Sequence, residues 1–116
     1  MSTFDITHER DSRTCIVRMQ GDIDIAVVPE LKSDLGSALD SGCMYLVLDL
    51  ADVSYADSSA LGLLVWLYHR LRPCDGSVVL AGANRDVSRI LELSGLTNLA
   101  SSIMMSANVD AAIEGL

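Results

Sequence analysis

The chain has few aromatic and few basic side chains. Aromatic residues make up 4% of its 116 residues, so a surface that stacks nucleic-acid bases is not expected. Its 8 Lys and Arg residues stand against 16 Asp and Glu residues, and the resulting formal charge of −8 repels phosphate backbones and anionic membranes. Nucleic acids and lipid head groups are therefore poor candidates for its partner.

Long apolar runs and clustered metal ligands are also missing. The longest apolar-rich stretch, residues 61–71, is interrupted by Gly62, His69 and Arg70 and is too short to span a bilayer. The N-terminus has no basic segment followed by an apolar one, as a signal peptide would. The sequence has no Cys-x-x-Cys motif, and its two histidines lie far apart. We therefore expect a cytoplasmic protein without membrane insertion, metal or cofactor.

The three cysteines do not predict a disulfide, because they are odd in number and widely spaced. We expect Cys15 and Cys43 to be packing residues in a reducing compartment. Cys74 follows Pro73 in a loop and is the thiol most expected at the surface. A redox switch through Cys74 is disfavoured, because Arg72 is its only basic neighbour.

Strand-like and helix-like segments alternate along the chain. Strands are predicted at residues 4–8, 14–20, 45–50, 77–81 and 100–105, with a break at 21–24 and a loop at 51–56. Helices are predicted from residue 28 to Gly42, from about residue 57 to Arg72, from the cap Asn84 to Gly95, and from the cap Asn108 onwards. This alternation predicts one α/β domain over residues 1–116, with a mixed four- to five-stranded sheet and about four helices packed on it.

The start of the second predicted helix carries the most informative polar residues, Asp57, Ser58 and Ser59. Asp and Ser are preferred helix N-caps, so capping alone accounts for them. A Ser-His-Asp triad is not predicted, because neither histidine is placed to activate Ser58. No phosphate-loop motif is present, and we interpret Gly82–Asn84 as a turn and cap rather than a nucleotide contact.

The rest of this helix presents two apolar surfaces. We expect the first to pack on the sheet, and at helical spacing it comprises Leu61, Leu64, Val65, Tyr68 and Leu71. Leu63 and Trp66 then project the other way, beside Gly62, where the missing side chain lets another backbone approach. Such a patch suits a contact with a partner protein or with a neighbouring helix of the same domain, and the pattern leaves both interpretations open.

Residues 46–62, LVLDLADVSYADSSALG, resemble the signature of the STAS domain family, and specifically of the bacterial anti-sigma-factor antagonists. Two further segments are similar to that family. Residues 21–24, GDID, resemble its acidic turn before the first helix, and residues 87–96, VSRILELSGL, resemble its third helix and exit. The resemblance extends over essentially the whole chain, so we expect the STAS fold.

The resemblance implies a regulator of transcription in a stress response, not an enzyme. In that family the unphosphorylated protein binds an anti-sigma factor, a serine kinase of the histidine-kinase-like ATPase fold, and thereby frees the sigma factor. Phosphorylation of the first serine of the motif, here Ser58, separates the complex. A serine phosphatase acting on the phosphorylated form restores the active protein.

The resemblance and the helix pattern together predict a partner-binding surface around Ser58. It comprises Asp22, Asp24, Asp57, Ser58, Ser59, Gly62, Leu63 and Trp66. The alternative function is that of a STAS accessory subunit docking on the ATPase of a lipid-transport ABC system.

Overall fold

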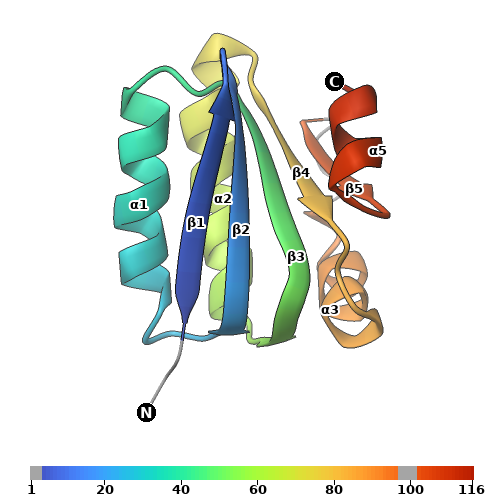
Figure 1. The fold of residues 1–116 in the computed structure, drawn as a ribbon. Helices are drawn as coiled ribbons and strands as arrows, with labels where there is room; N and C mark the ends of the chain where they lie inside the picture. The colour runs from blue at the N-terminus through green and yellow to red at the C-terminus, as the bar shows by residue number, and fades with distance from the viewer. Residues whose placement is uncertain (1–3, 97–101) are drawn as a thin grey trace.

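A five-stranded sheet forms the centre of the molecule, and its strand order follows the chain, β1-β2-β3-β4-β5. The computed structural model describes residues 4–96 and 102–116 (Figure 1). The strands are β1 (Asp5–Asp11), β2 (Thr14–Ile23), β3 (Tyr45–Ala56), β4 (Ser77–Ala81) and β5 (Ile103–Ser106). β1 pairs antiparallel with β2 and the other pairings are parallel, so the predicted mixed sheet is confirmed.

Helices cover both faces of the sheet. They are α1 (Val28–Asp40), α2 (Ser59–Leu71) with the 3₁₀ turn η1 (Arg72–Cys74), α3 (Arg85–Ser94) and α5 (Val109–Glu114). The larger apolar core lies between one face and α1, α2 and α3, and a smaller one lies under α5 (Figure 1). In β2 the side chains alternate between them, with Val17 in the larger core and Ile16 in the smaller. The predicted α/β fold is confirmed.

The predicted ends of the first three strands are wrong, because β1 runs on to Asp11 and β2 and β3 are also longer than expected. β2 continues through the predicted break to Ile23, and β3 continues through the predicted loop to Ala56. The extensions pair with each other, with Gly21 opposite Val53 and Ile23 opposite Ala56. The register is irregular there, and Gly21 has φ 116°, a conformation that other residues rarely adopt. This irregularity breaks the simple alternation by which strands are predicted.

The predicted helix caps are confirmed. The Asn84 side chain accepts a hydrogen bond from the Val87 amide at 2.9 Å, and α3 ends at Gly95 in the left-handed conformation. Asn108 accepts a hydrogen bond from the Ala111 amide at 2.8 Å at the start of α5. The last predicted strand begins later than expected, at Ile103, and its predicted residues 100 and 101 lie outside the described residues.

Cys15 and Cys43 pack in the larger core, as predicted, but the expectation that they form no disulfide is wrong. Both are buried, but they are joined as a disulfide with their Cα atoms 6.0 Å apart. The pairing follows from the fold, because Cys15 lies opposite Leu46 in the parallel register and Cys43 precedes that strand. Cys74 is exposed and free, as predicted.

In residues 4–96 and 102–116, no helix combines the length and apolar character needed to cross a bilayer. Across the same residues, no three or more His, Cys, Asp or Glu side chains gather where they could hold a metal ion.

Candidate functional site

The start of α2 lies beside the acidic segment 21–24, which comprises the last residues of β2 and Asp24. The backbone amide of Asp57 donates a hydrogen bond to the carbonyl oxygen of Ile23 at 3.0 Å. Ile23 also lies opposite Ala56 in the parallel register, so both strands end at the same edge of the sheet. Segments more than thirty residues apart thus form one surface, and the predicted proximity of the turn to the serines is confirmed.

Asp57 caps the start of α2. One of its carboxylate oxygens accepts a hydrogen bond from the Ser59 amide at 2.8 Å and another from the Ser59 hydroxyl. The Ser59 hydroxyl, followed by the backbone amides of Ser59 and Ile25, lowers the pKa of Asp57 below its ordinary value. Asp57 is therefore ionised at neutral pH, and its charge lies where the free amides of a helix start favour an anion.

Ser58 occupies the N-cap position, yet its side chain makes no capping hydrogen bond. Its backbone is already helical, with φ −62° and ψ −17°, and its carbonyl oxygen accepts a hydrogen bond from the Leu61 amide at 3.1 Å. The residue is exposed. Because Asp57 supplies the cap, no hydrogen bond that holds the helix depends on the Ser58 hydroxyl.

The two predicted acidic contacts differ in their roles. The Asp24 carboxylate accepts hydrogen bonds from the amides of Ala26 at 3.0 Å and Val27 at 3.1 Å, so it holds the turn that leads into α1. Asp22 is exposed and forms no side-chain hydrogen bond within the described residues. Of the pair, Asp22 is therefore the carboxylate that a partner can reach without breaking the turn.

Gly62 leaves an unfilled space on the exposed side of α2. It is exposed, and a Cβ atom built on it would meet no heavy atom within 4 Å. No internal contact therefore requires glycine here, although glycine weakens a helix interior by about 1 kcal/mol relative to alanine. The absence of a side chain leaves room for a backbone approaching from outside.

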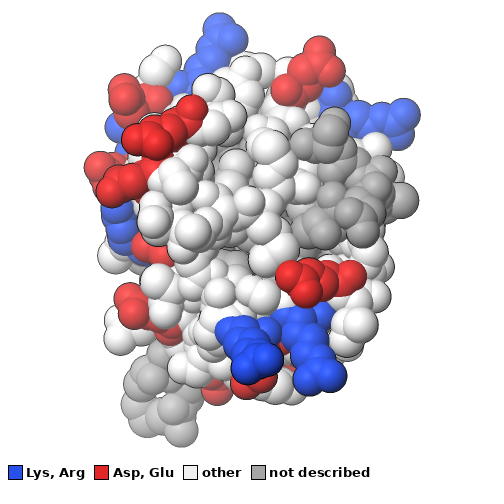
Figure 2. Space-filling view, turned by 90° about the vertical axis from the view of Figure 1, so that its right-hand side faces the viewer, with Lys and Arg blue, Asp and Glu red and all other residues white. Residues whose placement is uncertain are grey.

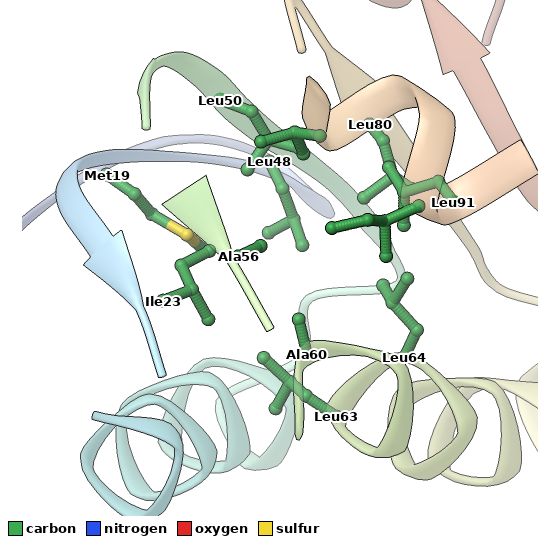
Figure 3. A pocket seen from close by; sticks show the side chains of 12 residues that line it. Met19, Ile23, Leu48, Leu50, Ala56, Ala60, Leu63, Leu64, Leu80 and Leu91 are labelled. Carbon is green, nitrogen blue, oxygen red and sulfur yellow. The ribbon is translucent and has the colours of Figure 1, made fainter. Parts of the chain in front are cut away.

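Leu63 does not lie on this exposed side, and Val65, predicted to pack on the sheet, is 37% exposed. The predicted orientation of α2 is therefore wrong at both residues. Leu63 is 3% exposed and points towards Ile23 of β2, whereas Leu64 points towards Leu91 of α3 (Figure 3). These side chains line an apolar cavity of about 30 Å³, which is too small for a ligand beyond the size of one water molecule. Leu63 is a core residue, and the structure removes it from the predicted contact surface.

Trp66 fills the seam between α1 and α2. Its ring lies 5.5 Å from the Arg70 guanidinium and 5.9 Å from the Lys32 ammonium, and it packs beside Gly36 of α1. Arg70 in turn donates a hydrogen bond to Asp40 at 2.7 Å, which adds a second tie between the two helices. The sequence left open whether Trp66 contacts a partner protein or a neighbouring helix of the same domain. The structure supports the neighbouring helix, and the Trp66 side chain is half-buried.

Two exposed apolar side chains near Ser58 were not predicted. Ile25, 77% exposed, follows the acidic turn, and Tyr55, 53% exposed, precedes Asp57 at the end of β3. No periodic pattern marks them, because Ile25 lies in a turn and Tyr55 in an irregular part of its strand. With Asp22, Ser58 and Gly62, they form what we call the Ser58 surface.

Asn84 joins α3 to this end of the sheet. Its side-chain amide donates hydrogen bonds to the carbonyl oxygens of Val53 at 3.1 Å and Ser54 at 3.2 Å. Figure 2 shows basic side chains gathered at the lower end of this side of the molecule, over α3, which carries Arg85 and Arg89. Neither arginine forms an ion pair within the described residues. Because α3 also carries Asp86 and Glu92, its formal charges balance.

These features define a class of protein, a mixed α/β domain that carries an exposed serine at the start of its second sheet-packed helix. The model of the STAS domain family matches residues 5–112 of this chain. The chain therefore belongs to the STAS domain family.

Its relatives by sequence are antagonists of anti-sigma factors. The chain is 32% identical over 83 residues to the anti-sigma-B factor antagonist of Staphylococcus epidermidis, which covers 72% of this chain and 77% of the relative. Among solved structures, the anti-sigma factor antagonist SpoIIAA in its unphosphorylated form matches with a TM-score of 0.82 at 23% identity, over 96% of this chain and 95% of that one. The Bacillus cell fate determinant SpoIIAA in the phosphorylated form matches with a TM-score of 0.74 at 21% identity, over 96% and 98%. These two likenesses establish the fold.

Proposed function

We propose that this chain acts as a single-domain anti-sigma-factor antagonist, and that phosphorylation of Ser58 switches its binding to an anti-sigma factor. The observation that carries the proposal is the division of roles at the start of α2. Asp57 caps the helix, while the Ser58 hydroxyl is exposed and takes no part in capping. A residue that must change its chemical state without unfolding the domain needs this arrangement.

A phosphate on Ser58 adds about −1.5 to −2 charges. The free amides and the dipole of the helix start offset that charge locally, so the fold is expected to persist. A partner packed on the Ser58 surface would have to bury the dianion, which costs several kcal/mol unless arginines meet it. Reversing a population from 99:1 to 1:99 requires about 5.5 kcal/mol, and one phosphate in an interface supplies much of that.

The proposed contact is the Ser58 surface. Ile25 and Tyr55 offer apolar area, Gly62 leaves room for a backbone, and Asp22 offers a free carboxylate. Ser59 contributes indirectly, because its hydroxyl and amide both hold Asp57 in place. The proposed partner is an anti-sigma factor that is also a serine kinase of the histidine-kinase-like ATPase fold.

A serine phosphatase completes the proposed cycle by removing the phosphate. The chain itself would act by binding, in the cytoplasm where sigma factors work, and the proposal requires no catalytic step in it. The names of the sequence relatives support the antagonist role, and the phosphorylated form of SpoIIAA supports a covalent switch in a protein of this fold.

The test is an affinity capture from lysate of the source cells with wild type, Ser58→Ala and Ser58→Glu as baits. Ser33→Glu, which places the same charge on the exposed side of α1, is the matched control. We expect mass spectrometry to find the ATPase-fold kinase with wild type, Ser58→Ala and Ser33→Glu, but not with Ser58→Glu. Circular dichroism should show native helix content for all four.

Equal capture of this kinase by all baits would show that Ser58 is not the switch. Recovery of ABC-transporter subunits in place of the kinase would favour the accessory-subunit function. Incubation of the purified kinase, ATP and Mg²⁺ with wild type and Ser58→Ala then locates the modified residue. Phosphate incorporation into Ser58→Ala at the wild-type level would exclude Ser58 as its site.

A further inference from the structure

We propose that Cys15 and Cys43 form a reversible thiol–disulfide site, closed by a small disulfide oxidant and reopened by a thiol reductant while the domain stays folded. The site lies apart from the Ser58 surface and does not depend on the proposed function. Cys43 follows the C-terminal end of α1, whereas Ile25 precedes its N-terminal end. A 13-residue helix, about 20 Å long, separates the two.

The backbone holds the two cysteines at the separation that a disulfide requires. Their Cα atoms are 6.0 Å apart, within the usual range of about 4.4–6.8 Å. Cys43 is fixed by its amide, which donates a hydrogen bond to the Ala38 carbonyl oxygen at 3.2 Å, and Cys15 is fixed in the sheet. The pair therefore needs no backbone movement to close or to open.

A groove between β1 and α1 gives access to the pair. Cys15 and Cys43 are only 4% and 3% exposed, but both line an open groove of about 300 Å³. Side-chain bonds cross this groove, from the His8 ring to the Asp34 carboxylate at 2.9 Å and from the Arg10 guanidinium to the Ser41 carbonyl oxygen at 2.9 Å. Cysteines enclosed in a core are inert. Cys15 and Cys43 pack in the larger core but also line this groove, so a small reagent reaches them when the exposed side chains move.

The reaction balances as two successive exchanges. The thiolate of one cysteine attacks a sulfur of glutathione disulfide, so that a mixed disulfide forms and one glutathione leaves as thiolate. The thiolate of the second cysteine then attacks the protein sulfur of the mixed disulfide and releases the second glutathione. Two cysteine thiols are oxidised and one glutathione disulfide is reduced to two thiols, and a reducing dithiol reverses both steps.

Closing the site ties the start of β2 to the segment between α1 and β3. The linked residues are 28 positions apart, and the chain between them contains all of α1. A cross-link of this kind restricts the unfolded chain, so the oxidised protein is expected to melt at a temperature roughly 5–15 °C higher. The oxidised domain then resists heat and proteolysis better than the reduced one.

The experiment counts thiols in the purified full-length protein. Reduced protein is equilibrated with buffers of graded ratio of reduced to oxidised glutathione, quenched with acid, unfolded and labelled with maleimide. Intact mass then reports the labels, and peptide mapping locates the bond. We expect three labels in reducing buffer. In oxidising buffer a Cys15–Cys43 peptide pair should appear, while Cys74 carries either the single remaining label or one glutathione as a mixed disulfide. A dithiol added in native buffer should restore three labels.

Cys74→Ser is the matched control, because it removes the exposed thiol and should keep the transition, from two labels to none. Cys15→Ala and Cys43→Ala should abolish both the transition and the rise in melting temperature. Three labels at every ratio would overturn the proposal, because the pair would then serve only in packing. A bond that opens only in denaturant would overturn it too, because the cross-link would then be permanent.

Discussion

Replacing Gly62 with alanine should change folding stability and partner binding in opposite directions. Alanine is favoured over glycine in a helix interior by about 1 kcal/mol. The added methyl group meets no heavy atom within 4 Å, so no strain offsets this gain. For a domain of 116 residues, the melting temperature should rise by about 3–6 °C, measured by calorimetry or by circular dichroism.

The same methyl group should weaken binding of the anti-sigma factor. If the partner's backbone fills the space beside Gly62, an added methyl overpacks the interface and costs about 1–3 kcal/mol. That corresponds to a roughly 5- to 150-fold increase in Kd, which titration calorimetry with the captured kinase resolves. A more stable protein that binds less well separates a contact residue from a folding residue.

Gly36→Ala is the matched control for this prediction. Gly36 lies in α1, and a Cβ atom there would be 3.6 Å from the Trp66 ring, an ordinary packing distance. This variant should also gain stability but keep the wild-type Kd, because Gly36 is buried away from the Ser58 surface. A lower melting temperature for Gly62→Ala would refute the open environment of Gly62. An unchanged Kd would remove Gly62 from the contact surface.

Three further predictions follow from the described contacts. Asp57→Asn should lower stability at neutral pH, because the hydrogen bonds that lower the pKa of Asp57 favour its charged form. The stabilisation by the carboxylate is complete above about pH 4 and is lost as the pH falls through the lowered pKa. Urea unfolding should therefore show a difference in the free energy of unfolding between wild type and Asp57→Asn at pH 7 that shrinks by about pH 3. A difference that stays constant with pH would contradict this prediction. Leu63→Ala should lower the free energy of unfolding by about 2–5 kcal/mol in the same assay, and a loss below about 1 kcal/mol would place Leu63 outside the core. Ile25→Ser should leave stability within about 0.5 kcal/mol but weaken kinase binding, and wild-type affinity would exclude Ile25 from the contact.

The larger elements could be predicted from the sequence because each carries a local signal. Asn84 and Asn108 mark helix starts, and Gly95 marks a helix end, through backbone preferences that act within a few residues. The orientation of α2 could not be predicted in this way. Leu63, Leu64 and Leu67 are all buried, so α2 buries a wide part of its circumference. The spacing of its apolar residues therefore does not identify the side that faces the sheet.

Long-range contacts account for the rest of what the sequence missed. Trp66 is covered by α1, a contact that its own helix does not encode. Cys15 and Cys43 meet because the parallel pairing of β2 with β3 places the start of β2 beside the residues that precede β3. In the candidate site, the motif pointed to Ser58. Only the structure shows that Asp57 caps the helix and that the Ser58 side chain does not.

The order of the strands in the sheet has a consequence for how the chain is made. Each strand pairs with the strand before it, so no pairing has to wait for a distant segment to leave the ribosome. Every residue of the Ser58 surface lies in the part of the chain between the start of β1 and the end of α2, and this part precedes β4. The elements that follow add α3 to the larger core, and they complete the other edge of the sheet and the second core under α5. Synthesis therefore makes the segment that carries Ser58 before the far edge of the sheet.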